Sequence, residues 1–182
     1  VNSKATKSLI FVGSSGSITQ TMCAITSAFW PQSTEELKGA VDRYLKLSPK
    51  DDCSDCPHGP IGEWDVSRVT DMSSLFAEAE SFNGDISKWD VSSVTDMSAI
   101  FRWVTSFHGD ISKWVVSSVV TMKHTFAASN FNGDISKWDV SSVKDMSQMF
   151  NLATSFNGTI SRWDVSSVKD MSQMFSRARS FN

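Results

Sequence analysis

A unit of about 25 residues recurs through the last two-thirds of the chain, and this repeat restricts the fold more than any other feature. Five tryptophans mark its phase at intervals of 25, 25, 24 and 25 residues: Trp64, Trp89, Trp114, Trp138 and Trp163. A fixed period in this range is typical of proteins in which each unit stacks on the next. We therefore expect residues 59–182 to form a solenoid of about five units with a shared apolar core, and the five tryptophans to be structural.

One stretch of each unit predicts a short helix. Met72, Leu75, Phe76 and Ala79 are apolar at spacings i, i+3, i+4 and i+7, which would place them on one face of a helix. Three further copies repeat this pattern. A residue able to cap a helix precedes each of the five stretches: Asp71, Asp96, Thr121, Asp145 and Asp170.

The remainder of the unit predicts an extended backbone. Trp89 and Val91 lie two residues apart between turn-forming pairs, which favours a short strand around Trp-x-Val. The unit ends in a phenylalanine and an asparagine, and we expect the asparagines to form a buried ladder that bonds the backbone of the turns. These residues are Phe82, Phe107, Phe131, Phe156 and Phe181, followed by Asn83, Asn132, Asn157 and Asn182, with His108 in the second copy.

The segments before the repeats differ from them in composition. Residues 1–32 include an uncharged stretch, residues 8–30, which we expect to dock on a partner or a membrane surface; a spanning helix or the remnant of a targeting segment are the alternatives. Residues 33–58 predict a helix and a connector. Ser33 and Glu36 form a capping box, and the helix would cover the first face of the stack.

Composition excludes some classes of function. The chain has 182 residues and a net charge of −3, so it lacks the basic footprint of a nucleic-acid-binding protein. Cys53 and Cys56 form a C-x-x-C pair, but no second pair completes a zinc site, so a local disulfide or free thiols are favoured over a metal. No cofactor is expected. The repeats contain only two histidines, His108 and His124, and no paired general acid and base outside the regular columns. We therefore expect no enzymatic activity.

Candidate contact residues lie where a copy departs from the common pattern, because the repeated positions are occupied with packing. The third copy departs most, and Trp103 in the second occupies a position that is not aromatic elsewhere; an exposed tryptophan there would be a contact anchor. Sequence drift is the alternative. The candidate partner-contact residues are Trp103, Val115, Val120, Lys123 and His124. At the last copy, Met174, Phe175 and Phe181 are expected to form an exposed apolar end that further chain or another protein covers.

Two rows of aspartates are expected to stack along the repeats. One contains Asp65, Asp90, Asp139 and Asp164, and the other Asp85, Asp110 and Asp134. Bridging by calcium is conceivable, but the glycine-aspartate motif of calcium-binding repeats is absent. We expect the rows to pair instead with a nearby row of cations: Lys88, Lys113, Lys137 and Arg162.

The repeated blocks Trp-Asp-Val-Ser, Asp-Met-Ser and Phe-Asn-Gly resemble the BspA-like surface repeats that are also known from mycoplasma lipoproteins. The resemblance covers residues 59–182 and implies an α/β, leucine-rich-repeat-like solenoid used for surface attachment or protein contact. It also implies no catalytic residues. Similar repeats are abundant in unicellular algae, whose versions share the lead-in helix. Residues 1–32 are not explained by the resemblance.

Three functional readings follow from these observations. The first is a non-enzymatic module whose stacked units present a surface to a partner protein. The second is an accessory subunit of a large membrane-bound complex in an alga, such as a photosynthetic complex. The third is an extracellular adhesin that binds protein or glycan. All three place the chain in a larger assembly or at a cell or organellar surface.

Overall fold

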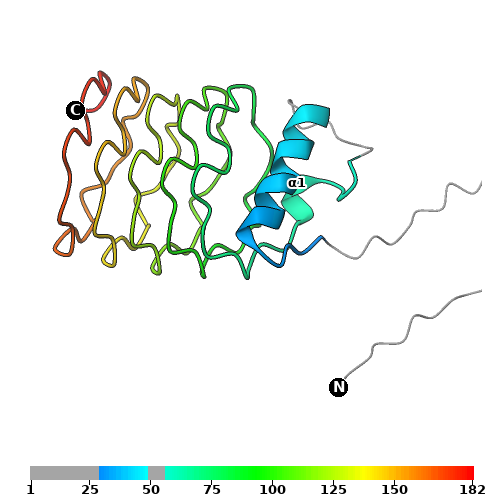
Figure 1. The fold of residues 1–182 in the computed structure, drawn as a ribbon. Coiled ribbons are helices and arrows are strands. Elements are labelled where there is room, and N and C mark those ends of the chain that lie inside the picture. The colour runs from blue at the N-terminus through cyan, green and yellow to red at the C-terminus, as the bar shows by residue number, and fades with distance from the viewer. Residues whose placement is uncertain (1–28, 49–55) are drawn as a thin grey trace, which may run out of the picture.

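The computed structural model describes residues 29–48 and 56–182. This part contains one α-helix, α1 (Thr34–Leu47), one short 3-10 helix, η1 (Ile61–Glu63), and four isolated parallel bridges between successive copies. The rest of the described backbone consists of turns and irregular segments. Figure 1 shows the copies following one another as a stack of loops, with α1 against one end and the C-terminus at the other.

The predicted α/β, leucine-rich-repeat-like solenoid is wrong. Within the described ranges, the copies contain no α-helix and no strand, and the bridges join single residues such as Asp71 and Asp96. What stacks is therefore a set of turns. The stack is held together by hydrogen bonds and ring contacts between equivalent positions of adjacent copies, and not by helices or sheets.

The stretch predicted as a short helix folds into alternating turns because two residues of each copy adopt a left-handed backbone. In the first copy these are Ser74 and Glu78, with φ of 57° and 68°. A left-handed residue cannot continue a right-handed helix. The equivalent residues of the later copies are also left-handed: Ala99, Trp103, His124, Ala128, Gln148, Leu152, Gln173 and Arg177.

The alternation divides the backbone amides into two sets. The N–H groups of Met72 and Ser74 donate to the next copy, to the carbonyls of Asp96 and Ser98, at 2.9 and 2.8 Å. The N–H of Leu75, between two such donors, instead bonds within its own copy, to the carbonyl of Met72 at 3.2 Å. The same alternation recurs in the next three copies, so we call this stretch the ladder face. In the first copy it still buries Met72, Leu75 and Phe76, three of the four apolar residues that suggested a helix.

The Trp-x-Val stretch is held by side-chain bonds and not by strand pairing. Turns close from Ile86 to Trp89 and from Val91 to Val94. The indole N–H of Trp89 donates to the carbonyl of Ile61 in the preceding copy at 2.9 Å. Trp114, Trp138 and Trp163 bond the preceding copy in the same way. Each indole is therefore buried with its one donor satisfied.

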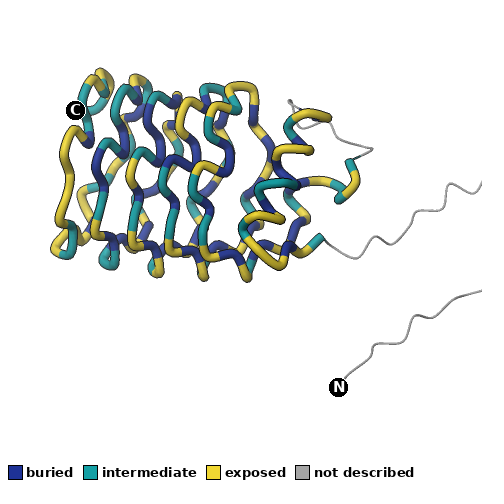
Figure 2. The backbone as a smooth tube through the Cα atoms, in the orientation of Figure 1, coloured by how far each residue is buried: buried dark blue, intermediate teal, exposed yellow. Residues whose placement is uncertain are grey.

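Phenylalanine rings form the centre of the stack. One column contains Phe76, Phe101, Phe126, Phe150 and Phe175, whose successive ring centroids are 5.4 to 5.7 Å apart and nearly parallel. Each of these rings also stacks on the second phenylalanine of its own copy, as Phe76 does on Phe82 at 4.1 Å. Buried residues continue along the inside of the stack as far as the last copy, which is mostly exposed or half-buried (Figure 2).

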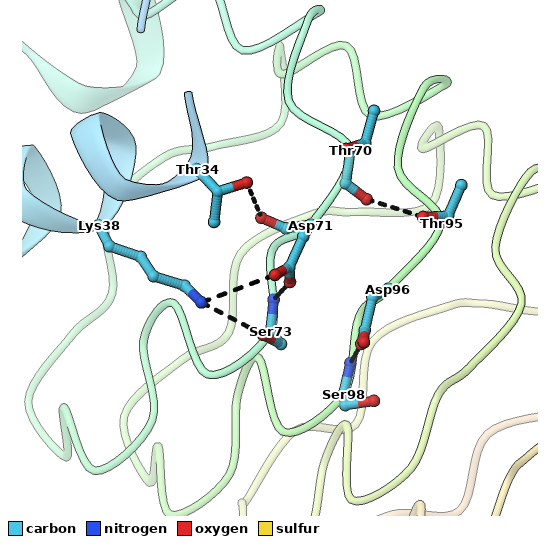
Figure 3. A network of polar contacts seen from close by, with 8 residues as sticks. All are labelled: Thr34, Lys38, Thr70, Asp71, Ser73, Thr95, Asp96 and Ser98. Atoms are coloured by element: carbon cyan, nitrogen blue, oxygen red, sulfur yellow. Dashed lines mark hydrogen bonds and ion pairs between the residues drawn. The ribbon is translucent and has the colours of Figure 1, made fainter. Parts of the chain in front are cut away.

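Helix α1 covers the first copy. The side chain of Ser33 accepts a hydrogen bond from the N–H of Glu36, which is half of the predicted capping box. Leu37, Val41 and Tyr44 are buried against the stack. Figure 3 shows the start of the helix on the ladder face, where the Thr34 hydroxyl donates to the Asp71 carbonyl at 3.1 Å.

The expectations for residues 8–28, including a spanning helix, concern positions outside the described residues. No helix in the described part is both long and apolar enough to cross a membrane. Phe29 and Trp30, at the end of the uncharged stretch, contact the chain itself. The Phe29 carbonyl accepts the N–H of Asp65 at 2.8 Å, and Trp30 lies under the guanidinium of Arg68.

Candidate functional site

An aromatic and basic patch lies on the ladder face of the second and third copies. It consists of Arg102, Trp103, Val120, Lys123 and His124, and we call it the ladder patch. Its position follows from the backbone: the N–H of Ala99 bonds the carbonyl of Lys123, and the N–H of Trp103 bonds that of Ala127. Four of its residues were expected from the sequence. Arg102 was missed, because a charged residue at a variable position gives no signal by itself.

Trp103 is the exposed aromatic side chain of this patch. Its relative exposure is 44%, whereas the five repeat tryptophans are at most 9% exposed. Its left-handed φ of 62° and its amide bond to Ala127 fix the backbone. Ala128 and Leu152 occupy the same position in the next two copies, so the tryptophan heads a short apolar row. A rigidly held aromatic loses little entropy when a partner covers it.

Charged residues of both signs lie near the tryptophan in the ladder: Arg102 precedes it in the chain, and Glu78 holds the equivalent position of the preceding copy. Burial lowers the pKa of His124, and the charges of Lys123 and Arg102 lower it further, while Asp145 acts in the opposite direction. Lys123 and Arg102 therefore lie close enough to His124 for their charges to act on it. The patch combines one aromatic anchor with two cations, a composition that suits an acidic protein surface.

The other predicted contact residue, Val115, does not join the ladder patch. It precedes the turn that runs from Val116 to Val119, whereas Val120 follows that turn. Both valines are exposed, at 54% and 44%. A turn thus separates Val115 from Val120, which leads directly into the ladder stretch of the third copy.

The final copy presents an end that no further copy covers in this structure. Met174 is buried, and Phe175 and Phe181 are partly buried, so less apolar surface is exposed than the sequence suggested. Four backbone N–H groups of its ladder stretch donate to no backbone carbonyl among the described residues. They belong to Met171, Gln173, Phe175 and Arg177, whose equivalents in earlier copies all bond onward.

The aspartate rows are organised by serines. Asp139 accepts hydrogen bonds from the hydroxyl and the N–H of Ser141, at 2.6 and 3.1 Å. These bonds lower the pKa of Asp139, and the same pair of bonds acts on the other row members with lowered pKa values. Of the predicted cations, only Lys88 forms an ion pair in the described chain, and its partner is Glu63. Lys88, Lys113 and Lys137 nevertheless act on the second row, since their charges help the serine bonds to lower the pKa values of Asp85, Asp110 and Asp134.

The residues expected to cap helices act through the same motif. Asp71 and Asp96 each accept the N–H of the serine two residues later at 2.7 Å, as Figure 3 shows for both. The ammonium of Lys38 approaches Asp71 at 3.9 Å. These carboxylates therefore fix local turns at the start of each ladder stretch. The residues that the structure describes contain no cluster of histidine, cysteine and acidic side chains suited to a metal ion.

The asparagine column bonds turn backbones as expected, although its members are exposed and not buried. The side-chain carbonyl of Asn83 accepts the N–H of His108 at 2.8 Å, and that of Asn132 accepts the N–H of Asn157 at 2.7 Å.

Near the first copy, Cys56 is disulfide-bonded, so its thiol is not available to a metal. Cys53 lies outside the described residues.

The fold and its surface define a tandem-repeat protein whose copies stack in register and present variable side chains on the outside. A family model described as "Mycoplasma protein of unknown function, DUF285" matches residues 51–136 and 127–182. The chain belongs to this family. No curated protein and no solved structure matches it.

Proposed function

We propose that this chain is a surface repeat protein of the BspA-like type that binds another protein through the ladder patch. The exposure of Trp103 carries the proposal. Every other repeat position holding a tryptophan buries it, whereas Trp103 stands in solvent on a backbone fixed by the neighbouring copy. Exposed tryptophans with adjacent arginines are enriched among the residues that dominate protein interfaces.

The charge of the patch indicates the chemistry of the partner. Arg102 precedes the tryptophan in the chain, Lys123 belongs to the copy that its ladder stretch bonds, and burial together with these two charges lowers the pKa of His124. We expect an acidic partner surface with an apolar pocket for the indole. The settings of an adhesin or of a subunit in a membrane-bound complex remain predictions, because both are compatible with this patch.

The test uses the full chain as an affinity bait on extracts and surface fractions of the source cells. Trp103→Ala should remove the specific partner, with an affinity loss of roughly 30-fold or more. Arg102→Glu should weaken binding and reverse its salt dependence. Trp30→Ala is the matched control, since this tryptophan is 52% exposed but lies outside the patch, against Arg68 of the first copy.

The bound protein should be identified by mass spectrometry and its affinity measured with purified components. Thermal unfolding of each variant checks that the fold is retained, which is expected because Trp103 is exposed and lies outside the buried core. A partner that binds wild type, Trp103→Ala and Trp30→Ala equally would rule out the ladder patch as the contact surface.

A further inference from the structure

A polar groove crosses the junction between the fourth and fifth copies, away from the ladder patch. Its volume is about 530 Å³, within the size range of small-molecule sites. Six of the residues that line it carry the argument below: Asn132, Asp134, Lys137, Asn157, Thr159 and Arg162. We call it the junction groove. Small-molecule sites are usually lined by apolar side chains, so this lining points to a ligand that is itself polar.

The charges of the groove are unbalanced because one carboxylate of a row is missing. In the fourth copy Asp134 precedes Lys137 by three residues, and the charge of Lys137 contributes to lowering the pKa of Asp134. The fifth copy has Thr159 in place of the aspartate and Arg162 in place of the lysine. Within the ranges that the structure describes, Arg162 forms no ion pair.

Hydrogen-bond donors face the same space. The side-chain carbonyl of Asn132 is engaged by the N–H of Asn157 at 2.7 Å, which leaves the Asn132 amide NH₂ as the unused end. Asp134 is occupied by Ser136, whose N–H donates to it at 2.9 Å. Arg162 offers a planar fork of N–H groups that matches a carboxylate in a bidentate arrangement.

We propose that the junction groove binds an acidic sugar, with the sugar carboxylate on Arg162 and its hydroxyls on the asparagine amides and Thr159. A carboxylate replaces the charge that Thr159 removed from the row. Sugar hydroxyls both donate and accept hydrogen bonds, as do the amides and hydroxyls of the groove. Neither the ladder patch nor its protein partner is needed for this binding.

The test titrates the isotopically labelled full chain with glucuronate and follows its amide signals by nuclear magnetic resonance. Saturable shifts are expected at Asn157, Gly158 and Thr159. Glucose, which differs by lacking the carboxylate, should produce none. Acetate, which has the carboxylate without the ring, should bind at least roughly tenfold more weakly.

Two variants remove the charge imbalance in different ways. Arg162→Gln deletes the cation, and Thr159→Asp restores the missing carboxylate, which Ser161 can bond as serines do in the other copies. Both should lower glucuronate affinity by roughly tenfold or more. Lys113→Gln is the matched control, because it removes a cation of the same row outside the groove, and it should bind normally.

Three results with these probes would overturn the proposal. They are an absence of saturable shifts, binding that neither groove variant weakens, and equal affinity for acetate and glucuronate, which would show an anion site without sugar recognition. Inorganic sulfate serves as a fourth probe. If it competes with glucuronate at equal affinity, the carboxylate and ring are not what the groove recognises, and the proposal fails.

Discussion

At the scale of single residues, the most frequent device is an aspartate followed two positions later by a serine. The serine N–H bonds the carboxylate in every such pair from Asp65 to Asp170. Such a pair closes a turn without any partner outside the segment. It explains how copies that lack helices and strands still have a defined backbone at their corners.

These carboxylates predict loss of stability in acid. Serine hydroxyls and N–H groups lower the pKa of Asp139 and Asp164 below the ordinary value of 3.8. A carboxyl whose pKa is lowered in the folded state stabilises the fold fully above pH 3.8. This stabilisation is lost as the pH falls from 3.8 through the lowered pKa of the folded state. The melting temperature should therefore be constant near pH 6 and fall steeply below about pH 4.

The serine hydroxyl can be tested separately. Ser141→Ala removes the 2.6 Å bond to Asp139, so the pKa of that carboxyl should rise towards 3.8 when it is titrated by nuclear magnetic resonance. Ser142→Ala changes the neighbouring serine and should leave the Asp139 titration as it is. An unchanged Asp139 pKa in Ser141→Ala would show that the hydroxyl does not set it.

The buried tryptophans give the largest single-residue effects. Trp138 is 4% exposed and bonds the carbonyl of Ile111 at 3.1 Å. Trp138→Ala should lower the free energy of unfolding by roughly 3–5 kcal/mol, because it leaves a cavity and an unpaired carbonyl. Chemical denaturation measures this. A loss no larger than that of Trp30→Ala would contradict the assignment of Trp138 to the core.

At the scale of elements, burial could be read from the sequence and backbone conformation could not. Met72, Leu75 and Phe76 are buried, as their spacing required. The helical spacing was misleading because alternating turns bury the same positions as a helix would. In addition, the residue types at left-handed positions, such as Ser74 and Gln148, do not distinguish these positions from helical ones. Helix α1 was predictable because a capping residue and a longer apolar stripe support each other.

The candidate sites were predictable to a smaller extent. Trp103, Lys123 and His124 stood out as departures from their columns, but Arg102 and the separation of Val115 required the turn geometry. The junction groove left one signal in the sequence, the replacement of a row aspartate by Thr159. Its meaning depends on which side chains line the same space, and that information is three-dimensional.

Two glycines test the contrast between α1 and the copies. A methyl group on Gly39, inside α1, would meet nothing within 4 Å, whereas on Gly62 it would clash with the backbone carbonyl of Asp85. Gly39→Ala should stabilise the protein by about 0.5–1 kcal/mol. Gly62→Ala should destabilise it by about 1–3 kcal/mol, because backbone must shift. Melting curves of the two variants should move in opposite directions, and parallel shifts would refute this account.

At the scale of the whole molecule, stability resides in the contacts between adjacent copies. In the last copy, four backbone N–H groups could donate to a further copy, and Phe175 and Phe181 could each stack on another ring. Appending residues 133–157 after Asn182 should therefore raise the melting temperature, because the new copy supplies carbonyls and apolar cover. A scrambled 25-residue extension of the same composition is the control, and an equal effect of both would refute the prediction.

The third copy is one residue shorter than its neighbours, and the position of the missing residue has a consequence for evolution. Trp138 reaches Ile111 across 27 residues, whereas Trp114 reaches Ile86 across 28, yet the two bonds are nearly equal in length. The missing residue shortens only the turn before Phe131, and the hydrogen bonds between adjacent copies on either side of that turn are unchanged. Gene segments that encode whole copies can thus be gained or lost by unequal recombination without redesign, and small errors at that corner are tolerated.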